Sequence, residues 1–287
     1  MAGGPGRRLW PLSTNKTPKQ FLRLFAGKTL FEITIDRVHK LLPWDRIYIC
    51  TVGEEYKKTI INLCPNLLPD NVIVEPESRD SGPAHGLGAL YIIKRDTDAV
   101  VVNAASDQII EPEENYLAAM HAAAKYAYRE KKLVAVGIKP SYAHTGLGYI
   151  RKGTKLCNIQ KFDVFKLEKF SEKPKLRLAK KYIDMGDYYW NANNYVWRAD
   201  LYLDSLKKHA LRIYKGLEKI SQGIGTRGES AVLQKYFPKL PKISVDYAVS
   251  EKSKDFVMLI GDYYWSDISN WKEVWNNLDK DEVRNAT

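Results

Sequence analysis

Short apolar runs typical of β-strands alternate with segments of helical periodicity along most of the chain. The strand-like runs occupy residues 46–52, 71–76, 99–105, 132–138, 162–170 and 255–262. Several of them are continuous apolar stretches, as expected for strands that are covered on both faces. Helical patterns cover residues 29–42, 113–132 and 199–220. This alternation predicts an α/β protein in which helices pack on both faces of one central sheet.

The length and composition are those of a folded domain. The chain has 287 residues, of which 45% are hydrophobic and 28% charged, and these values exclude disorder along the whole chain. It contains no repeat and no linker-like tract, so one domain over residues 1–287 is the simplest prediction. No apolar run approaches the ~20 residues that span a bilayer. Three widely spaced cysteines, Cys50, Cys64 and Cys157, predict neither a disulfide framework nor a metal site and indicate a reducing, cytoplasmic compartment.

The formal charge is +11, because 45 Lys and Arg face 34 Asp and Glu. Much of the excess lies in residues 151–181, which hold 11 basic and 3 acidic residues, a local charge of +8. Such a segment is a solvated basic face, a nucleic-acid site or a site for a small anionic substrate. No nucleic-acid recognition motif accompanies it.

A glycine-rich segment begins at residue 2, where Gly3, Gly4 and Gly6 are followed by Arg8 and Lys19. Glycines let successive backbone N–H groups approach an anion, and Arg and Lys add charged donors for phosphate oxygens. A loop of this kind normally follows a strand that anchors it. Only Met1 precedes the loop in this sequence.

The full string "AGGPGRRLWPLSTNKTPKQF" resembles the signature of the sugar-1-phosphate nucleotidyltransferases, and its "PKQF" ending resembles the mannose-1-phosphate guanylyltransferases among them. Further segments match the family pattern in the same order: "EPESRDSGPAHGLGAL" (75–90), "AASDQII" (104–110), "TGLGYI" (145–150), "FSEKP" (170–174), "YWNANNYVWRAD" (189–200), "ISVDYAVSEK" (243–252) and "YWSDISNW" (264–271). The resemblance covers essentially the whole chain.

The resemblance implies a three-layer Rossmann-like nucleotidyltransferase domain with a central mixed, mostly parallel sheet. It implies that a sugar-1-phosphate oxygen attacks the α-phosphorus of a nucleoside triphosphate and releases pyrophosphate. The expected substrates are GTP and mannose-1-phosphate, and the expected cofactor is Mg²⁺. Another sugar phosphate or another nucleotide stays open, as does a truncated domain that binds a nucleotide without turnover. Neither nucleic acid nor a membrane is an expected partner, and the possibility of a homodimer stays open.

The matched motifs assign roles to individual residues. The catalytic positions are Arg8 and Lys19. The nucleotide-binding positions are Gly3, Gly4, Gly6, Arg79, Ser81 and Pro83. The positions for the sugar phosphate are Gly148, Glu172, Lys173 and Asn191. The Mg²⁺ ligands are Asp107 and Asp267. Each also has a structural interpretation: Asp107 and Asp267 suit turns or helix N-caps at strand ends, and Arg8 and Lys19 suit solvated surface positions.

Three residues depart from the family pattern, which usually has Asn where Asp80 stands, Ala where Gly82 stands and Gly where Asn193 stands. Asn tolerates left-handed backbone better than most residues, so the turn at Asn193 is expected to persist. The family's first strand would precede the glycine loop, and we expect it to be absent from this chain. The chain ends soon after Trp271, so we also expect the family's C-terminal extension to be absent.

Overall fold

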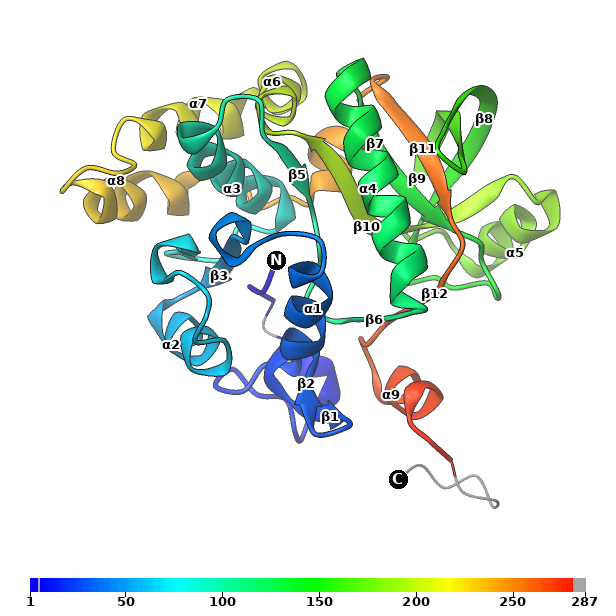
Figure 1. The fold of residues 1–287 in the computed structure, drawn as a ribbon, viewed down its shortest axis with the longest axis horizontal. Coiled ribbons are helices and arrows are strands. Elements are labelled where there is room, and N and C mark those ends of the chain that lie inside the picture. The colour runs from blue at the N-terminus through cyan, green and yellow to red at the C-terminus, as the bar shows by residue number, and fades with distance from the viewer. Residues whose placement is uncertain (5, 281–287) are drawn as a thin grey trace.

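The computed structural model describes residues 1–4 and 6–280. Its largest sheet has six strands in the order β5–β10–β7–β11–β9–β8. Their bounds are β5 (Val100–Val102), β10 (Tyr188–Arg198), β7 (Leu133–Ile138), β11 (Phe256–Gly261), β9 (Phe162–Ser171) and β8 (Gly148–Ile159). β10 also pairs with β8, so one long strand contacts β5, β7 and β8. In Figure 1 these strands extend from the centre of the molecule, at β5, to its upper right, at β8.

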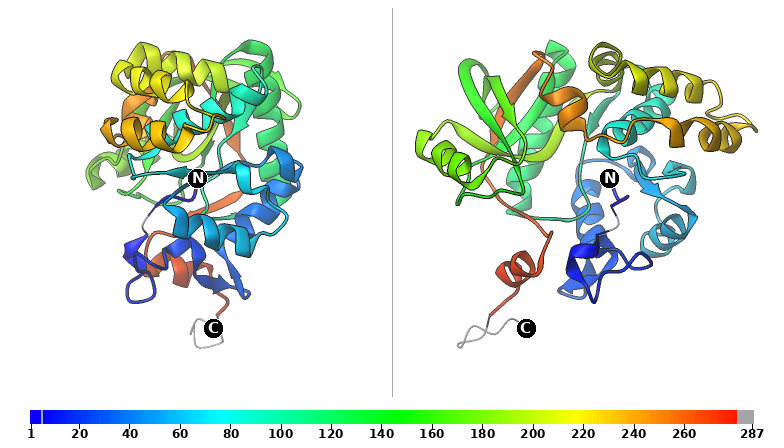
Figure 2. Two further views of the ribbon diagram at one scale, coloured as in Figure 1. Left: turned by 90° about the vertical axis from the view of Figure 1, so that its left-hand side faces the viewer. Right: turned by 180° about the vertical axis from the view of Figure 1, so that it is seen from behind.

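Helices cover both faces of this sheet. α3 (Ser81–Arg95), α6 (Ala199–His209) and α7 (Leu211–Ser221) pack on one face, and α4 (Glu113–Glu130) and α5 (Leu176–Met185) pack on the other. β7 supplies Leu133 and Ala135 to the first core and Val134, Val136 and Ile138 to the second. Side chains alternate across a strand, so the continuous apolar run of β7 serves both faces. The two views of Figure 2 show helices on either side of the strands.

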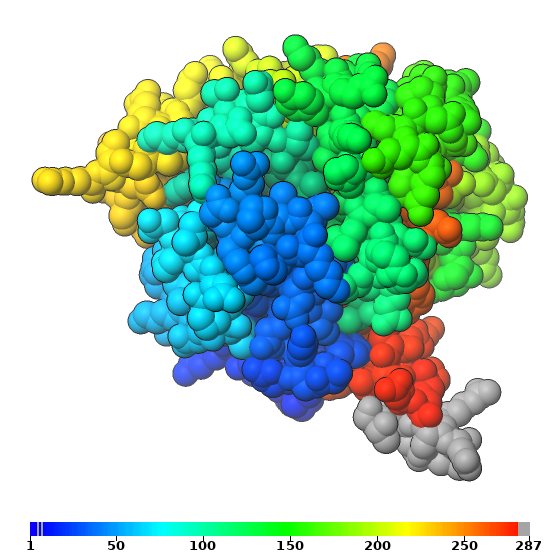
Figure 3. Space-filling model, viewed as in Figure 1, coloured from blue at the N-terminus to red at the C-terminus, as the bar shows by residue number. Residues whose placement is uncertain are grey.

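A second unit is built on β3 (Ile49–Val52) and β4 (Val72–Glu75), which pair in parallel. α1 (Leu30–His39) and α2 (Glu54–Leu63) contribute Phe31, Ile35 and Ile60 to its core. Thr29 and Glu32 form a reciprocal capping box that fixes the start of α1. In Figure 3, α1 and α4 lie side by side on the front face of the molecule.

Smaller elements complete the fold. β1 (Arg23–Phe25) pairs with β2 (Lys28–Thr29), and β6 (Gln108–Glu111) pairs with β12 (Tyr264–Asp267). α8 (Glu229–Tyr236) follows α7, and α9 (Trp271–Asn277) packs Val274 against Leu9 and Phe25. Short 3-10 turns cover Arg7–Leu9, Lys19–Phe21, Trp44–Arg46, Pro69–Asn71 and Phe237–Lys239, and a π-helical turn covers Asp246–Ser250. The three cysteines are free, and no helix in the described ranges is long and apolar enough to cross a bilayer.

The α/β class, the mixed central sheet and its two helical layers confirm the predicted fold. Two details of the prediction were wrong. The six-stranded sheet is not mostly parallel, because only the β7–β11 pair in it is parallel. Residues 199–220 do not form one helix, because the backbone of Ala210 (φ −141°, ψ 53°) ends α6 before α7 begins. This break allows α7 to turn and pack on α3 and α8.

Candidate active site

The glycine-rich loop is held at the carboxyl ends of β3 and β4. The amide of Ala2 donates to the carbonyl of Cys50 at 2.8 Å. The side-chain amide of Gln20 donates to the carbonyls of Ala2 and Gly4 at 3.0 and 3.1 Å. The first bond uses the N–H group of Ala2, whereas the two Gln20 bonds use carbonyl oxygens of the loop. This anchoring leaves the backbone N–H groups of Gly3 and Gly4 for an anion. Gln20 was not predicted as a functional residue.

Gly6 allows the loop to lie directly against Lys19. Its φ is +52°, a left-handed conformation that most side chains disfavour. A Cβ at this position would lie 2.6 Å from Lys19 Cγ and 2.7 Å from Lys19 N. Glycine is therefore required here both by backbone conformation and by space.

Lys19 joins the two predicted metal-ligand aspartates. Its Nζ lies 2.8 Å from Asp107 Oδ2 and 3.5 Å from Asp267 Oδ1, and it donates to the carbonyl of Ile268 at 2.9 Å. Only 12% of the lysine side chain is exposed, so this is not the solvated surface cation of the alternative interpretation. Burial opposes its charge, but the two carboxylates outweigh that effect and raise the pKa of Lys19. Burial and repulsion from Asp107 raise the pKa of Asp267.

The pairing of two short strands brings Asp107 and Asp267 together. Asp107 immediately precedes β6, and Asp267 ends β12 opposite Gln108. The amide of Ile268 donates to the carbonyl of Asp107 at 2.9 Å, which closes this end of the pair. Both side chains are a little over one quarter exposed, so their remaining oxygen atoms can reach a ligand from solvent.

Arg8 lies in the turn after the glycine loop and is exposed. No ion pair holds it among the described residues. The next turn is fixed from the other end of the chain, because the indole N–H of Trp271 in α9 donates to the carbonyl of Trp10 at 3.0 Å. Among the described residues, the Arg8 guanidinium therefore has no ion-pair partner, while the turn next to it is held in place by Trp271.

The segment from Arg79 to Pro83 forms the start of α3. Asp80 is the N-cap, with φ +67°, and its carboxylate accepts from the amide of Ser81 at 2.7 Å. Ser81 Oγ accepts from the amide of Val245 at 2.9 Å. Pro83 is buried in the first helical turn. Arg79 pairs with Glu77 at 2.9 Å, and its Nε is buried without a hydrogen-bond partner in the described structure.

The two family departures in this segment have structural reasons. Asp is one of the few residue types enriched at positive φ, which suits the backbone of Asp80. At Gly82 a Cβ would lie 2.8 Å from the carbonyl oxygen of Ile243. The amide of Gly82 donates to that same carbonyl at 3.0 Å. Glycine thus allows the 243–245 segment to pack directly on the helix start.

The residues predicted for the sugar phosphate also converge. Gly148 pairs with Asn191 across β8 and β10. A Cβ on Gly148 would lie 2.5 Å from Glu172 Oε2 and 3.4 Å from Asn191 Cβ, so the three residues are in contact. Lys173 Nζ lies 2.7 Å from Glu172 Oε1. Burial, reinforced by Asp246, raises the pKa of Glu172 despite that lysine.

A buried polar network supports Asn191, and the prediction missed it. The Asn191 side-chain amide donates to the hydroxyl of Tyr195 and to Asp246 Oδ1, both at 2.8 Å. The hydroxyl of Tyr195 donates to the same Asp246 oxygen at 2.7 Å. Asp246 begins the π-helical turn, an irregularity that is frequent at functional sites. The "ISVDYAVSEK" motif contained this aspartate, but no role was assigned to it.

Hydrogen bonds link these groups into one region. The side-chain amide of Gln108, next to Asp107, donates to the carbonyl of Ala192 at 2.9 Å, next to Asn191. On the other side, Val245 contacts Ser81 and precedes Asp246. The aspartate–lysine group, the start of α3 and the Gly148 group are therefore neighbours, although they come from distant parts of the sequence.

The basic segment 151–181 lies on the β8–β9 hairpin and on α5. Two of its cations pair within the hairpin: Lys155 with Asp163 at 2.9 Å and Lys166 with Glu168 at 3.2 Å. Lys173 is the member that contacts a predicted site residue, Glu172. A solvated basic face therefore describes most of this segment.

Glu75, at the end of β4, is a second buried acid that the prediction missed. It is 2% exposed, and burial raises its pKa to about 8. A Cβ on Gly3 would lie 3.5 Å from its Oε1, so this carboxyl group lies beside the glycine loop. Its position in the "EPESRD" motif marked the segment, but the sequence did not reveal the burial of its side chain.

We expect Glu75→Gln to change how stability depends on pH. The native state keeps a proton on Glu75 up to about pH 8, whereas the unfolded chain loses it near 4.5. The wild type should therefore lose stability between about pH 4.5 and 8, relative to a variant without this group. We expect the free energy of unfolding of Glu75→Gln, relative to wild type, to rise by about 1–3 kcal/mol from pH 5 to pH 8. Urea unfolding at both pH values measures it. Glu55→Gln, at an exposed position on α2, is the control, and parallel pH curves for Glu75→Gln and wild type would contradict the expectation.

The fold and the candidate site indicate a class of protein, the nucleotidyl transferases. Comparison with known proteins supports this class. A family model described as nucleotidyl transferase matches residues 1–283. The chain belongs to the nucleotidyl transferase family. A crystal structure described as mannose-1-phosphate geranyltransferase from Thermus thermophilus superposes with a TM-score of 0.81 at 30% identity, over 98% of this chain and 79% of that one.

The names of similar proteins indicate which members of the nucleotidyl transferase class this chain resembles. A mannose-1-phosphate guanylyltransferase of Salmonella montevideo is 37% identical over 296 residues, which cover 100% of this chain and 61% of the relative. One of Escherichia coli (strain K12) is 36% identical over 280 residues, which cover 96% of this chain and 58% of the relative. The chain thus spans about 60% of the length of these relatives.

Proposed function

We propose that this chain is a nucleotidyltransferase catalytic domain that converts mannose-1-phosphate and GTP into GDP-mannose and pyrophosphate. The observation that carries the proposal is the convergence of Lys19, Asp107 and Asp267 beside a glycine loop. The names of the similar proteins supply the sugar and the base. The reaction joins two anions that repel each other, so the protein must position them and offset their charge.

The triphosphate is proposed to bind at the glycine loop. Backbone N–H groups of Gly3, Gly4 and Gly6 would donate to phosphate oxygens. Arg8 is free to add a two-pronged contact to the charge that develops in the transition state. Lys19 would transfer one of its donors from the carboxylates to a phosphate oxygen. Arg79, Ser81 and Pro83 at the start of α3 are proposed to line the nucleotide side. The charged donor there would be the guanidinium of Arg79, because the first N–H groups of α3 already donate to Asp80 and Ile243.

Asp107 and Asp267 have the donor set that suits Mg²⁺. Both carboxylates reach one cationic atom, Lys19 Nζ, so their oxygen atoms are within reach of a single cation. No group of three or more His, Cys, Asp or Glu forms a metal cluster in the described ranges. Two carboxylates suffice because Mg²⁺ keeps water and phosphate oxygens as its other ligands. When bound, the ion would offset charge on the phosphate oxygens.

The sugar phosphate is proposed to bind where Gly148, Glu172, Lys173 and Asn191 meet. Glu172 can accept hydrogen bonds from sugar hydroxyls, and Lys173 offers an exposed ammonium group to the phosphate. Asp246 and Tyr195 act as positioning residues, because they fix the amide of Asn191 through buried hydrogen bonds. Glycine at position 148 allows the Glu172 carboxylate to lie directly against the strand.

Pyrophosphate release tests the proposal directly. The four common nucleoside triphosphates are each combined with mannose-1-phosphate, glucose-1-phosphate and N-acetylglucosamine-1-phosphate in the presence of Mg²⁺. We expect GTP with mannose-1-phosphate to give the highest kcat/KM. Release that is faster with another pair would replace the substrate assignment, and no release with any pair would reject the enzyme assignment.

Gly148→Ala should weaken binding of the sugar phosphate. Its Cβ would lie 2.5 Å from Glu172 Oε2, so the carboxylate must move away from its present position. We expect KM for mannose-1-phosphate to rise about tenfold or more, the effect of losing roughly 1.4 kcal/mol of binding, with KM for GTP nearly unchanged.

Gly153→Ala is a matched control for this prediction. It lies on the same strand, and its Cβ would lie 2.5 Å from Cγ of Glu168 in β9, whereas Glu172 directly follows β9. In that pair Glu168 is exposed and Gly153 is half-buried. Steady-state kinetics should show a raised KM for mannose-1-phosphate in Gly148→Ala but not in Gly153→Ala. Equal KM values for mannose-1-phosphate in the two variants would contradict the placement of the sugar site.

A further inference from the structure

The carboxylate of Glu273 in α9 joins two segments that lead into the candidate site. Its Oε1 atom accepts from the hydroxyl of Tyr142 at 3.0 Å, and its Oε2 atom accepts from the hydroxyl of Ser266 at 3.3 Å. Ser266 directly precedes Asp267, the proposed metal ligand at the end of β12. Tyr142 lies in the loop 139–147, which connects β7 to β8. One side chain thus bridges the strand that carries a proposed metal ligand and a loop from a distant part of the sequence.

The loop that contains Tyr142 is also held at its other end. The hydroxyl of Tyr149 accepts from the amide of His144 at 3.0 Å and donates to the carbonyl of His144 at 3.1 Å. The ring of Tyr142 packs edge to face on Trp190, with 5.2 Å between the ring centroids. These contacts fix the chain on both sides of Gly148, a residue of the proposed sugar-phosphate site.

The surroundings of Glu273 supply hydrogen bonds but no opposite charge. The residue is only 7% exposed, and it forms no ion pair with any residue that the structure describes. A third donor, the side-chain amide of Asn276, lies 3.4 Å from Oε2. A carboxylate that is removed from water without a cation depends on hydrogen bonds to compensate for the lost hydration. The bonds to Tyr142 and Ser266 are therefore the main polar contacts of this buried group.

The helix that carries Glu273 is itself fixed against the nucleotide side of the candidate site. The indole N–H of Trp271 donates to the carbonyl of Trp10 in the turn after the glycine loop. Val274 belongs to the same buried cluster as Leu9 of that turn. Because α9 is anchored to the glycine-loop segment, its bond to Tyr142 positions the sugar-side loop relative to the nucleotide side.

We propose that Glu273 is a positioning residue that holds the sugar-phosphate site in alignment with Asp267 and the glycine loop. The inference rests on the proposed function, because it concerns the alignment of the two substrates of that reaction. In-line attack requires the attacking oxygen and the α-phosphorus to be precisely placed, and a displacement of about 1 Å can cost ~100-fold in rate. Glu273 acts through Tyr142 and Ser266 and needs no contact with either substrate.

The experiment separates the hydrogen bonds of Glu273 from its charge. Glu273→Gln removes the charge but can keep both bonds, because its amide oxygen can accept from Tyr142 and its amide N–H group can donate to Ser266. Glu273→Ala removes both bonds. Tyr142→Phe removes one bond and keeps the aromatic ring on Trp190. Pyrophosphate release is measured for these variants and for the Tyr142→Phe/Glu273→Ala double variant, with the substrate pair that the wild type turns over fastest.

We expect Glu273→Ala to lower kcat about tenfold or more, with KM for both substrates within about threefold of wild type. Tyr142→Phe should lower kcat by about three- to tenfold, and Glu273→Gln should stay within about threefold of wild type. Adding Tyr142→Phe to Glu273→Ala should lower kcat no further, because the bond that it removes is already lost.

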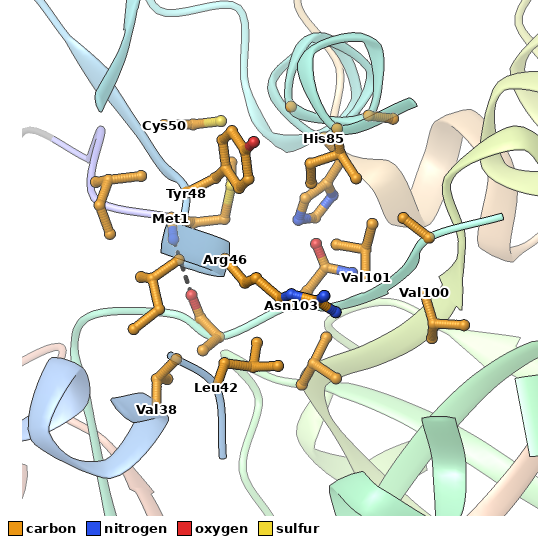
Figure 4. Close-up of a pocket in the computed structure, with 18 of the residues that line it drawn as sticks. Met1, Val38, Leu42, Arg46, Tyr48, Cys50, His85, Val100, Val101 and Asn103 are labelled. Carbon is orange, nitrogen blue, oxygen red and sulfur yellow. Dashed lines mark hydrogen bonds between the residues drawn. The ribbon is translucent and has the colours of Figure 1, made fainter. Parts of the chain in front are cut away.

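Leu42→Ala is the control for a loss of stability alone. Leu42 lies beyond the carboxyl-terminal end of α1, where it borders a cavity of about 720 Å³ between β3 and β5 (Figure 4). Its truncation enlarges the cavity and should lower the melting temperature by about 2–6 °C, with kcat at 25 °C within about twofold of wild type. A purely structural role of Glu273 predicts this same pattern for Glu273→Ala.

Unchanged kcat in Glu273→Ala and Tyr142→Phe, in a wild type that releases pyrophosphate, would overturn the positioning role and leave the proposed function intact. Equal losses in Glu273→Gln and Glu273→Ala would also overturn it, because the charge rather than the bonds would then be responsible. So would a further loss of kcat in the double variant. If Glu273→Ala does not fold, the kcat of Tyr142→Phe decides the question. No release by the wild type with any substrate pair would reject the proposed function and the positioning role together.

Discussion

Replacing Asp107 with Asn should lower kcat by about 100- to 1000-fold, the cost of losing one preorganised electrostatic group at a phosphoryl-transfer site. Asn keeps the size of the side chain but removes the charge that a divalent cation requires. The fold should survive, because Lys19 keeps Asp267 as a partner and the two aspartates no longer repel each other. We expect the free energy of unfolding to change by less than about 1 kcal/mol. Pyrophosphate release and urea unfolding measure the two quantities.

The matched control is Asp184→Asn, at an exposed position on α5. It removes the same charge from the protein surface and should leave kcat within about twofold of wild type. Near-native turnover of Asp107→Asn would reject the proposed metal role of this residue. A loss of turnover that accompanies unfolding would instead assign Asp107 a structural role.

Replacing Lys19 with Met should reduce kcat/KM by about 100-fold or more and also change how the protein responds to Mg²⁺. In the structure, the ammonium group of Lys19 lies between two carboxylates that would otherwise repel each other. Without it, the protein should be less stable in the absence of metal. Added Mg²⁺ should then restore stability, because a ligand that binds only the native state stabilises it by mass action. The rise in melting temperature on addition of Mg²⁺ should therefore be larger in Lys19→Met than in wild type.

Lys16→Met is the control, since Lys16 is exposed on the same loop and has the same chemistry. It should lower neither turnover nor the melting temperature appreciably. An identical Mg²⁺ response in Lys19→Met and wild type would mean that the two aspartates do not share a metal ion. It would leave the proposed contact between Lys19 and the triphosphate to be judged from kinetics alone.

The strands that are mostly apolar could be predicted, and so could the alternating strand β9, whereas β10 could not. β7 and β11 are continuous hydrophobic runs, and the sequence analysis located both. β10, with the sequence "YYWNANNYVWR", carries polar residues at its centre because they form the buried network around Asn191. Strand direction also escaped prediction, because the order of elements along the chain does not determine whether neighbours in a sheet are parallel.

Some residues of the candidate site could likewise be predicted from the sequence, and others could not. Resemblance to a known family singled out Lys19, Asp107 and Asp267, and their contacts agree with a shared site. Glu75 and Asp246 were missed because their significance lies in burial and in partners from distant segments. For the basic stretch the sequence left several interpretations open, because local sequence records its charge but not the direction in which its side chains point.

Asn193 shows how an exposed residue can still be restricted. Its φ is +55°, and its amide bonds to the Asn191 side chain at 3.3 Å, between the part of β10 that pairs with β8 and the part that pairs with β5. Surface positions ordinarily accept many amino acids, yet left-handed backbone admits chiefly Gly, Asn and Asp. Position 193 therefore combines high accessibility with a narrow mutational repertoire, and the restriction comes from the backbone rather than from packing.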